Sequence, residues 1–174
     1  IIIPRKGVNE LVGLLESDGG MVELEFGRNH LRVRRGDVTF TTKLIDGKFP
    51  DYEAVIPLSA DKTAVLARDV LRGALQRAGI LSNEKYRGVR LELSPGKLRI
   101  VAHNPEQEEA VEEVEAETQV SELAVGFNVG YLLDALGALQ GEKARLSLRD
   151  AQSSCLVQEV DDERAQHVIM PLRL

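Results

Sequence analysis

The sequence predicts an α+β fold built from repeated helix-plus-antiparallel-meander units. Three segments carry apolar residues at helical spacing, and each is followed by runs in which apolar and polar residues alternate. Sequences typical of tight turns separate several of these runs. Because the same order of elements recurs three times, the repeat indicates the architecture before any single residue does.

The first repeat begins after Pro4. Its helix has apolar residues at the i, i+3, i+4, i+7 spacing of one stripe: Val8, Leu11, Val12 and Leu15. Three alternating runs then predict strands at 22–26, 31–34 and 38–41. Turn residues at 27–29 and 36–37 separate them, so this repeat is a helix followed by a meander.

The second repeat has the same layout. Its helical stripe comprises Val70, Leu71, Ala74, Leu75 and Ala78. Strands are predicted at 89–93 and 98–101, around a Ser-Pro-Gly-Lys turn, and in an acidic run at about 108–117.

The third repeat has a stripe of Val129, Leu132, Leu133, Leu136 and Leu139. Strands are predicted at 144–148, 153–157 and 167–170. We interpret the second and third repeats as the halves of one domain, joined through 123–127.

That interpretation leaves the first repeat without a partner, so we expect one and a half domains. A helix on a three-stranded meander covers only part of its apolar face. Residues 1–56 are expected to be the second half of a domain with its linker, and 57–174 a complete domain. The apolar start Ile1-Ile2-Ile3 has neither an initiator Met nor a signal-peptide layout, which favours a preceding half. The alternative is one ordinary domain with unequal sheets.

Bulk properties are those of a soluble globular protein. The chain has 174 residues, 43% of them hydrophobic and 29% charged, and contains no apolar run long enough to cross a bilayer. Cys155 is the one cysteine, which argues against a disulfide scaffold and favours a reducing, cytoplasmic location.

Charge is distributed unevenly along the chain. The net charge of −6 argues by itself against a nucleic-acid partner. However, much of the acid is concentrated in one run: Glu106, Glu108, Glu109, Glu112, Glu113, Glu115 and Glu117. Arg68 and Arg72, with Arg77 beside them, give the second helix a positive stripe, whereas the third helix has none. This stripe fits either a surface facing phosphates or a solvated helix face.

Several longer segments closely resemble the bacterial DNA sliding clamp family, the beta subunit of DNA polymerase III. They are KLIDGKFPDY at 43–52, ILSNEKYRGVRL at 80–91, HNPEQEEA at 103–110, GFNVGYLLD at 126–134 and the ending VIMPLRL at 168–174. The resemblance runs through the whole chain and implies the DNA-clamp fold. It corresponds to the second half of the family's middle domain followed by the complete third domain.

The resemblance implies a non-catalytic processivity factor without a cofactor or metal. In this family, a homodimeric ring of three-domain subunits encircles duplex DNA, with helices lining the hole and sheets outside. A closed ring cannot dissociate sideways, so weak contacts to phosphates suffice. The positions that would form a loose positive lining are Arg5, Lys6, Arg68, Arg72 and Arg77.

The family also binds short peptides of the replicative polymerase, the clamp loader and repair proteins, in a pocket between the middle and third domains. The matching positions here are Pro50, Val55, Asn128, Tyr131, Ser154, Val168, Met170, Pro171, Leu172 and Arg173. Met, Leu, Val and Pro form an adaptable apolar slot, and Asn128 and Ser154 offer hydrogen bonds. From the residues alone, the tail also fits a buried last strand and Tyr131 an ordinary helix residue.

Other features limit what this chain does alone. Ala54 stands where several clamps have Arg, and Gln152 where an apolar residue is common, so peptide preference is expected to differ. The first half of the middle domain forms the other wall of the pocket, and its absence should weaken peptide binding. Ile80 and Leu81 match the family's ring interface, which needs a first domain from the opposite subunit.

Other function classes find little support. No Walker A loop, dinucleotide-binding glycine pattern or metal-binding His pair is present, and Ser153-Ser154-Cys155 lacks a nucleophile elbow. An acidic hydrolase or transferase using His103, Glu108 and Glu112 is disfavoured because charges that alternate along a strand do not converge in a cleft. A peptide-binding scaffold without a DNA role remains the alternative.

Overall fold

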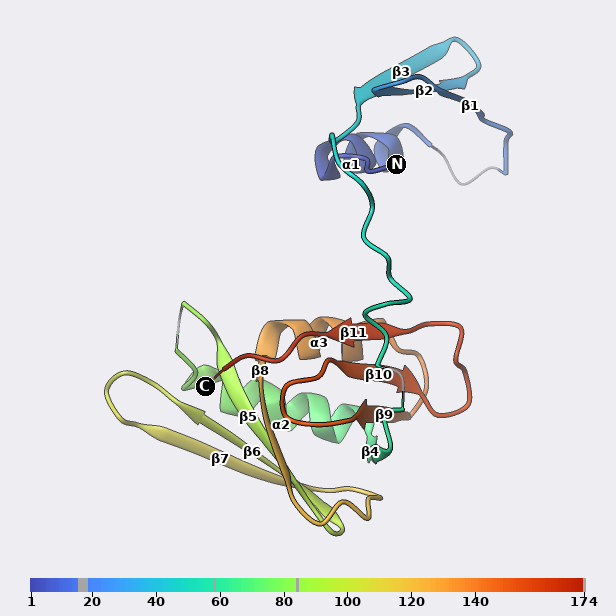
Figure 1. Cartoon of the computed structure of the whole chain (residues 1–174). Helices are drawn as coiled ribbons and strands as arrows, with labels where there is room; N and C mark the ends of the chain where they lie inside the picture. Colours follow the sequence, from blue (N-terminus) through green and yellow to red (C-terminus); the bar gives the residue numbers. More distant parts are fainter. Residues whose placement is uncertain (16–18, 58, 84, 174) are drawn as a thin grey trace. The chain divides into compact units, whose positions relative to one another are not determined.

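The computed structural model describes residues 1–15, 19–57, 59–83 and 85–173. Glu84 and Leu174, which belong to two of the segments that carry the resemblance, lie outside the described residues. The chain divides into two compact units, Ile1–Asp51 (unit 1) and Tyr52–Leu174 (unit 2) (Figure 1). This division falls five residues before the 56/57 boundary expected from the sequence, because the backbone of Val55 is hydrogen-bonded within unit 2.

Unit 1 contains one helix and one antiparallel sheet. The elements are α1 (Arg5–Leu14), β1 (Glu23–Phe26), β2 (His30–Arg35) and β3 (Val38–Lys43), and the strand order is β1-β2-β3. The predicted helix and three strands of the first repeat are therefore confirmed. Gly7 of α1 is buried against β3, where a Cβ atom would lie 2.8 Å from Thr42 Oγ1, so the close approach of helix and strand requires glycine.

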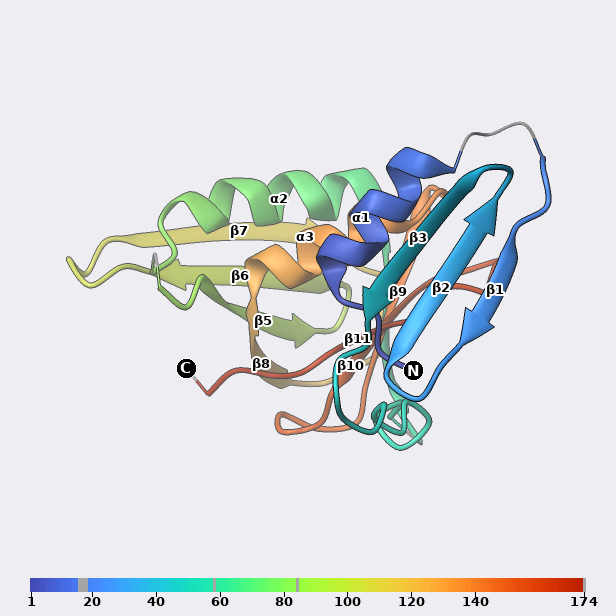
Figure 2. The ribbon, with the colours of Figure 1, turned by 90° about the horizontal axis from the view of Figure 1, so that it is seen from above.

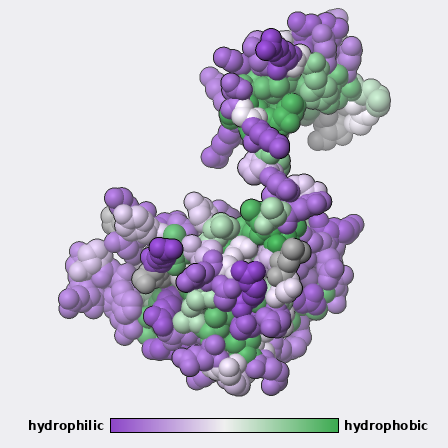
Figure 3. All heavy atoms as spheres, in the orientation of Figure 1, coloured by the Kyte–Doolittle hydropathy of each residue, from purple (hydrophilic) through white to green (hydrophobic). Residues whose placement is uncertain are grey.

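Unit 1 buries little apolar surface. Leu31 and Val33 of β2 are almost fully buried, whereas Val12, Met21 and Phe26 are 71%, 92% and 60% exposed. Apolar residues are correspondingly visible on the surface of this unit in Figure 3. A single helix leaves much of the apolar surface uncovered, as expected for half of a two-layer domain.

Unit 2 contains two four-stranded antiparallel sheets and two helices. In chain order its elements are β4 (Lys62–Ala67), α2 (Arg68–Ile80), β5 (Gly88–Ser94), β6 (Lys97–His103), β7 (Glu109–Glu115), β8 (Leu123–Asn128), α3 (Val129–Ala138), β9 (Lys143–Leu148), β10 (Cys155–Glu159) and β11 (His167–Ile169). The strand orders are β7-β6-β5-β8 and β11-β10-β9-β4. The predicted helices and meanders of the second and third repeats are confirmed.

The two repeats of unit 2 exchange their first strands. β4 precedes α2 but pairs with β9, and β8 precedes α3 but pairs with β5. The sequence interpretation was wrong here, because it treated 123–127 as a simple connection and assigned no strand at 62–67. Both strands run directly into a helix without a Gly or Pro break, so the switch from strand to helix leaves no turn signal.

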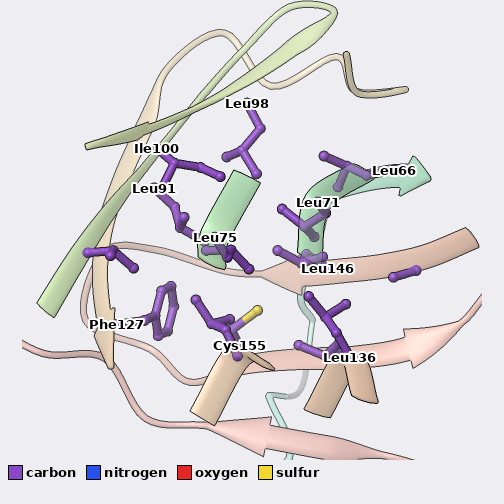
Figure 4. Close-up of a cluster of buried hydrophobic side chains, with 14 of the residues drawn as sticks. Leu66, Leu71, Leu75, Leu91, Leu98, Ile100, Phe127, Leu136, Leu146 and Cys155 are labelled. Carbon is purple, nitrogen blue, oxygen red and sulfur yellow. The ribbon is translucent and has the colours of Figure 1, made fainter. Parts of the chain in front are cut away.

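The helices of unit 2 contact each other, with α2 over β6 and β7 and α3 over β8 and β11 (Figure 2). Gly79 permits this approach, since a Cβ atom there would lie 3.3 Å from a methyl group of Val129. Leu71 and Leu75 of α2, Leu136 of α3 and Phe127 of β8 are buried in one shared core (Figure 4). No helix in the described residues is long and apolar enough to span a membrane.

The tail after β11 joins the two sheets. β11 belongs to one sheet, and two residues beyond Met170 the backbone N–H of Leu172 donates to the carbonyl of Gly126 in β8, at 2.8 Å. The tail therefore leaves one sheet and pairs with the edge of the other.

Candidate functional site

Three of the predicted pocket residues line one hollow of unit 2, which has a volume of about 690 Å³ and which we call the linker groove. It is lined by 54–57, 149–154 and Met170. Val55, Ser154 and Met170, all predicted from the sequence, lie in this lining. The Ser154 hydroxyl donates to the Val55 carbonyl at 2.9 Å, so the residue before β10 fixes the position of the linker.

The linker groove combines an adaptable apolar surface with a charged rim. Met170 is 61% exposed, and Ile56 and Pro57 extend the apolar lining. At the rim, the Arg149 guanidinium, 2.9 Å from Asp150, holds the pKa of that carboxyl well below its ordinary value, and the N–H of Gln152 adds to this shift. The groove therefore offers apolar contacts beside an Arg–Asp ion pair.

The two positions at which the sequence resemblance predicts a departure, Ala54 and Gln152, belong to the lining of the linker groove. The Ala54 side chain carries no charge, and the Gln152 amide offers both a hydrogen-bond donor and an acceptor.

A second hollow, of about 440 Å³, lies at the other end of the tail, and we call it the β5 hollow. Its lining comprises Asn83, Tyr86, Gly88, Arg90, Val101, His103, Leu172 and Arg173. Leu172 and Arg173 were predicted as pocket residues. The others were missed, because they come from β5, β6 and the loop before β5, whose proximity to the tail depends on the pairing of Leu172 with Gly126.

Asn128 has a structural role at the start of α3. Its Oδ1 accepts from the N–H of Gly130 at 2.8 Å, and its Nδ2 donates to the carbonyl of Tyr86 at 3.1 Å. It is thus an N-cap that also ties α3 to the loop before β5. Tyr131, one turn into the helix, is 62% exposed and available for contact.

The remaining predicted pocket residues are not gathered with these. Val168 of β11 and Pro171 of the tail are half-buried. Pro50 is exposed and belongs to unit 1. The sequence predicted one peptide-binding pocket, and the structure distributes some of its residues over two hollows: Met170 lines one and Leu172 the other, with Pro171 between them in the chain.

Two of the three arginines of α2 are engaged in structural contacts. Arg68 donates from Nη1 to the carbonyl of Leu139, at the end of α3, at 2.6 Å. Arg77 makes a two-pronged ion pair with Glu112 of β7, at 2.8 and 2.7 Å. Hydrogen bonding to Arg77 lowers the pKa of Glu112. Arg72 is exposed and has no ion pair among the described residues.

The other predicted surface positions are solvent-accessible. Arg5 and Lys6 are exposed in the first turn of α1 in unit 1. Ile80, at the end of α2, is 78% exposed, and Leu81 is half-buried beside it. An exposed Ile of this size at a helix end is available for contact with another chain.

Two of the four glutamates of β7 have a cationic partner among the described residues. Glu112 pairs with Arg77, and Glu113 pairs with Lys97 at 2.9 Å. Glu109 lies 3.7 Å from the His103 ring. Glu108, outside the strand, accepts from Asn104 and closes the turn before β7. The enzyme alternative needed His103, Glu108 and Glu112 together, but these residues have separate partners and only His103 lines a hollow.

Comparison with known proteins shows similarity over the full length of the chain. The pattern of the DNA polymerase III beta subunit, C-terminal domain, matches residues 53–173, and that of its central domain matches residues 1–51. The beta sliding clamp of Pseudomonas putida is 52% identical over 174 residues, which is all of this chain and 47% of that protein. The chain therefore spans about half the length of this relative.

Solved structures give the same similarity in three dimensions. The DNA polymerase sliding clamp of Pseudomonas aeruginosa, solved with a ligand, has a TM-score of 0.90 and 53% identity, covering 99% of this chain and 47% of that one. A sliding clamp of the same organism bound to griselimycin has a TM-score of 0.88, with the same identity and coverage.

Proposed function

Because this chain belongs to the DNA polymerase III beta subunit family, we propose that it is the central and carboxyl-terminal part of a DNA sliding clamp. The observation that carries the proposal is that the whole of this chain aligns with sliding clamps, with 52% sequence identity to one of them and a TM-score of 0.90 to another. The intact protein would be a non-catalytic accessory subunit that forms a ring around duplex DNA during replication. This role is favoured over that of a scaffold without DNA.

The mechanism would be topological. A closed ring stays on DNA without tight binding, and weak phosphate contacts allow it to slide. Arg72 supports this role because it is exposed on α2 without an ion pair among the described residues. Arg68 and Arg77 would contribute less than the sequence suggested, since their guanidinium groups already bind protein acceptors.

The linker groove would hold the anchor residues of clamp-binding peptides from the polymerase, the loader and repair proteins. Exposed Met170, with Ile56 and Pro57, supplies a surface that adapts to Leu or Phe side chains. Pro50, Tyr131 and Val168 would complete the site in the intact protein. A homodimer would form through Ile80 and Leu81 against a first domain, and the protein would act in the cytoplasm.

Clamp function is tested with a chimera that joins the amino-terminal part of the Pseudomonas aeruginosa clamp to this chain. We expect the chimera to increase the length of DNA synthesised per binding event by a cognate polymerase. Within the chimera, Arg72→Glu should shorten residence on nicked circular DNA, because it places a negative charge near the phosphates. A folded chimera that neither stays on circular DNA nor stimulates synthesis would refute the clamp proposal.

Peptide binding is tested by fluorescence anisotropy with a labelled peptide of the Gln-Leu-x-Leu-Phe type. Met170→Glu should weaken binding of the peptide to the chimera by at least about tenfold, since a carboxylate would be buried against the apolar anchors. Val70→Glu is the matched control, because Val70 is 56% exposed on α2 in unit 2 and lines neither hollow. Equal affinities of the two variants would remove the linker groove from the peptide site.

A further inference from the structure

We propose that the β5 hollow binds an acidic segment that flanks the anchor residues of a clamp-binding peptide. The inference rests on the proposed function, because the anchors themselves would occupy the linker groove. It assigns a charge preference, and a set of residues on β5 and β6, to peptide recognition.

The lining of the β5 hollow is positively charged. In a chain with a net charge of −6, its described residues include two cations, Arg90 and Arg173, and no Asp or Glu. Arg173 is exposed and forms no ion pair with the described residues. A ligand carboxylate would therefore meet cations rather than the acidic surface found elsewhere.

The nearby carboxylate does not fully neutralise Arg90. Glu92 lies 3.0 Å from both Arg90 and Arg99, so one negative charge is shared by two guanidinium groups. The Arg90 side chain is 55% exposed, which leaves its remaining N–H groups accessible to a second acceptor.

The lining of the β5 hollow also contains apolar side chains. Val101 is buried, and Tyr86 and Leu172 add an aromatic ring and an aliphatic side chain. A phosphate backbone has no group that gains from contact with apolar side chains. A peptide carries acidic and apolar side chains on one extended segment, so a peptide fits the lining better than DNA does.

The two hollows are lined by residues that lie close together in the tail. Met170 lines the linker groove and Leu172 lines the β5 hollow, with only Pro171 between them. Two residues of extended chain span roughly 7 Å. Three or four residues flanking an anchored motif would therefore reach from one hollow to the other.

The experiment uses two pairs of peptides that carry the anchor motif. In one pair the extension precedes the motif and in the other it follows the motif, and within each pair one extension consists of Asp and Glu and the other of Asn and Gln. In one of the two pairs, we expect the acidic peptide to bind about two- to fivefold more tightly than the amide peptide at low salt, with the difference lost at high salt. Arg90→Gln should abolish this preference, whereas Arg90→Lys should retain part of it. Affinity for the amide peptides should not change.

The matched control is Arg99→Gln. Arg99 pairs with the same Glu92 at the same distance but does not line the hollow. Loss of the acidic preference in Arg90→Gln but not in Arg99→Gln supports the inference. Equal loss in both variants, or no preference in the unmodified chain, overturns it, and circular dichroism of each variant confirms that the fold is retained.

A second measurement separates this inference from the proposed peptide groove. The acidic flank alone, without anchors, is titrated against the chain while the methyl NMR signals of Val101 and Leu172 are followed. Shifts with the acidic flank but not with its amide counterpart support the hollow even if the anchor peptides fail to bind. Shifts produced by duplex DNA and not by the acidic flank would overturn the peptide assignment.

Discussion

At the scale of single residues, the structure assigns several polar side chains to roles that depend on distant neighbours. Asn128 is a predicted peptide-binding residue, and in the structure it also caps α3 and donates to the carbonyl of Tyr86, 42 positions earlier. Arg68 is a predicted DNA-facing residue, and it also donates to the carbonyl of Leu139. The sequence identified these residues as notable, but it contains no local signal for a hydrogen bond to a distant segment.

Burial controls the chemistry of the one thiol. Cys155 is fully buried in β10, and its loss of solvation raises its pKa to about 12. We expect no labelling by Ellman's reagent in the native chain at mildly alkaline pH, because neither the thiolate nor access is available. Labelling should become complete in denaturant, and rapid labelling of the folded chain would contradict this burial.

The ion pair between Arg77 and Glu112 predicts a defined pH dependence. Because hydrogen bonding to Arg77 lowers the pKa of Glu112 below 4.5, the pair stabilises the fold at pH values above 4.5. This stabilisation is lost as the pH falls through the lowered pKa. Glu112→Gln should therefore reduce the melting temperature at neutral pH, with the difference disappearing in acid.

The control for that pair is Glu115→Gln. Glu115 is an exposed residue of the same strand and has no ion pair among the described residues. Its substitution should leave the melting temperature nearly unchanged at both pH values. If the two variants behave alike at neutral pH, the contact of Glu112 with Arg77 does not stabilise the fold.

At the scale of elements, apolar periodicity predicted the three helices and the strands of all three meanders. These elements were predictable because helical and alternating patterns differ strongly in period. β4 and β8 were not identified as strands, since a short strand that leads straight into a helix has no turn residue to mark it. The sequence also did not predict that β4 pairs with β9 and β8 with β5, because neither pairing joins strands that follow one another in the chain.

The packing of α2 is tested by two substitutions on opposite faces. Leu75 is fully buried between the helices and sheets, so Leu75→Ala should lower the free energy of unfolding by about 2–5 kcal/mol. Val70 lies on the same helix but is 56% exposed, and Val70→Ala should change it by no more than about 0.5 kcal/mol. Chemical denaturation measures both, and equal losses would contradict the observed burial.

The tail is held by a backbone contact that proline removes. Leu172→Pro deletes the N–H that donates to Gly126, so the tail should detach from β8 while the buried core persists. We expect faster carboxypeptidase removal of the tail with little change in the melting temperature. Arg173→Pro is the control, since no hydrogen bond of the Arg173 N–H is present among the described contacts.

At the scale of the whole molecule, the two units differ in how completely each is formed. Unit 2 has paired sheets and a continuous core, whereas unit 1 has one helix and leaves Val12, Met21 and Phe26 exposed. The count of helix-plus-meander repeats led us to expect one and a half domains, and the described part of unit 1 buries less apolar surface than that of unit 2.

Limited proteolysis tests the independence of the two units. Cleavage should occur first in 44–61, the segment between β3 and β4, because its described residues form no helix or strand. The larger product should retain a cooperative thermal transition. Simultaneous digestion of both units, without a stable product of unit 2, would show that unit 2 does not fold by itself.

The exchange of first strands also sets an order of events during synthesis. β4 pairs with β9 at Lys62 with Leu148 and at Ala67 with Lys143, so its partner residues follow it by 86 and 76 positions. At the usual speeds of translation, roughly 4–17 s separate the emergence of β4 from the ribosome and the emergence of its partner β9. Throughout that interval, the nascent chain must keep an apolar strand unpaired without aggregating.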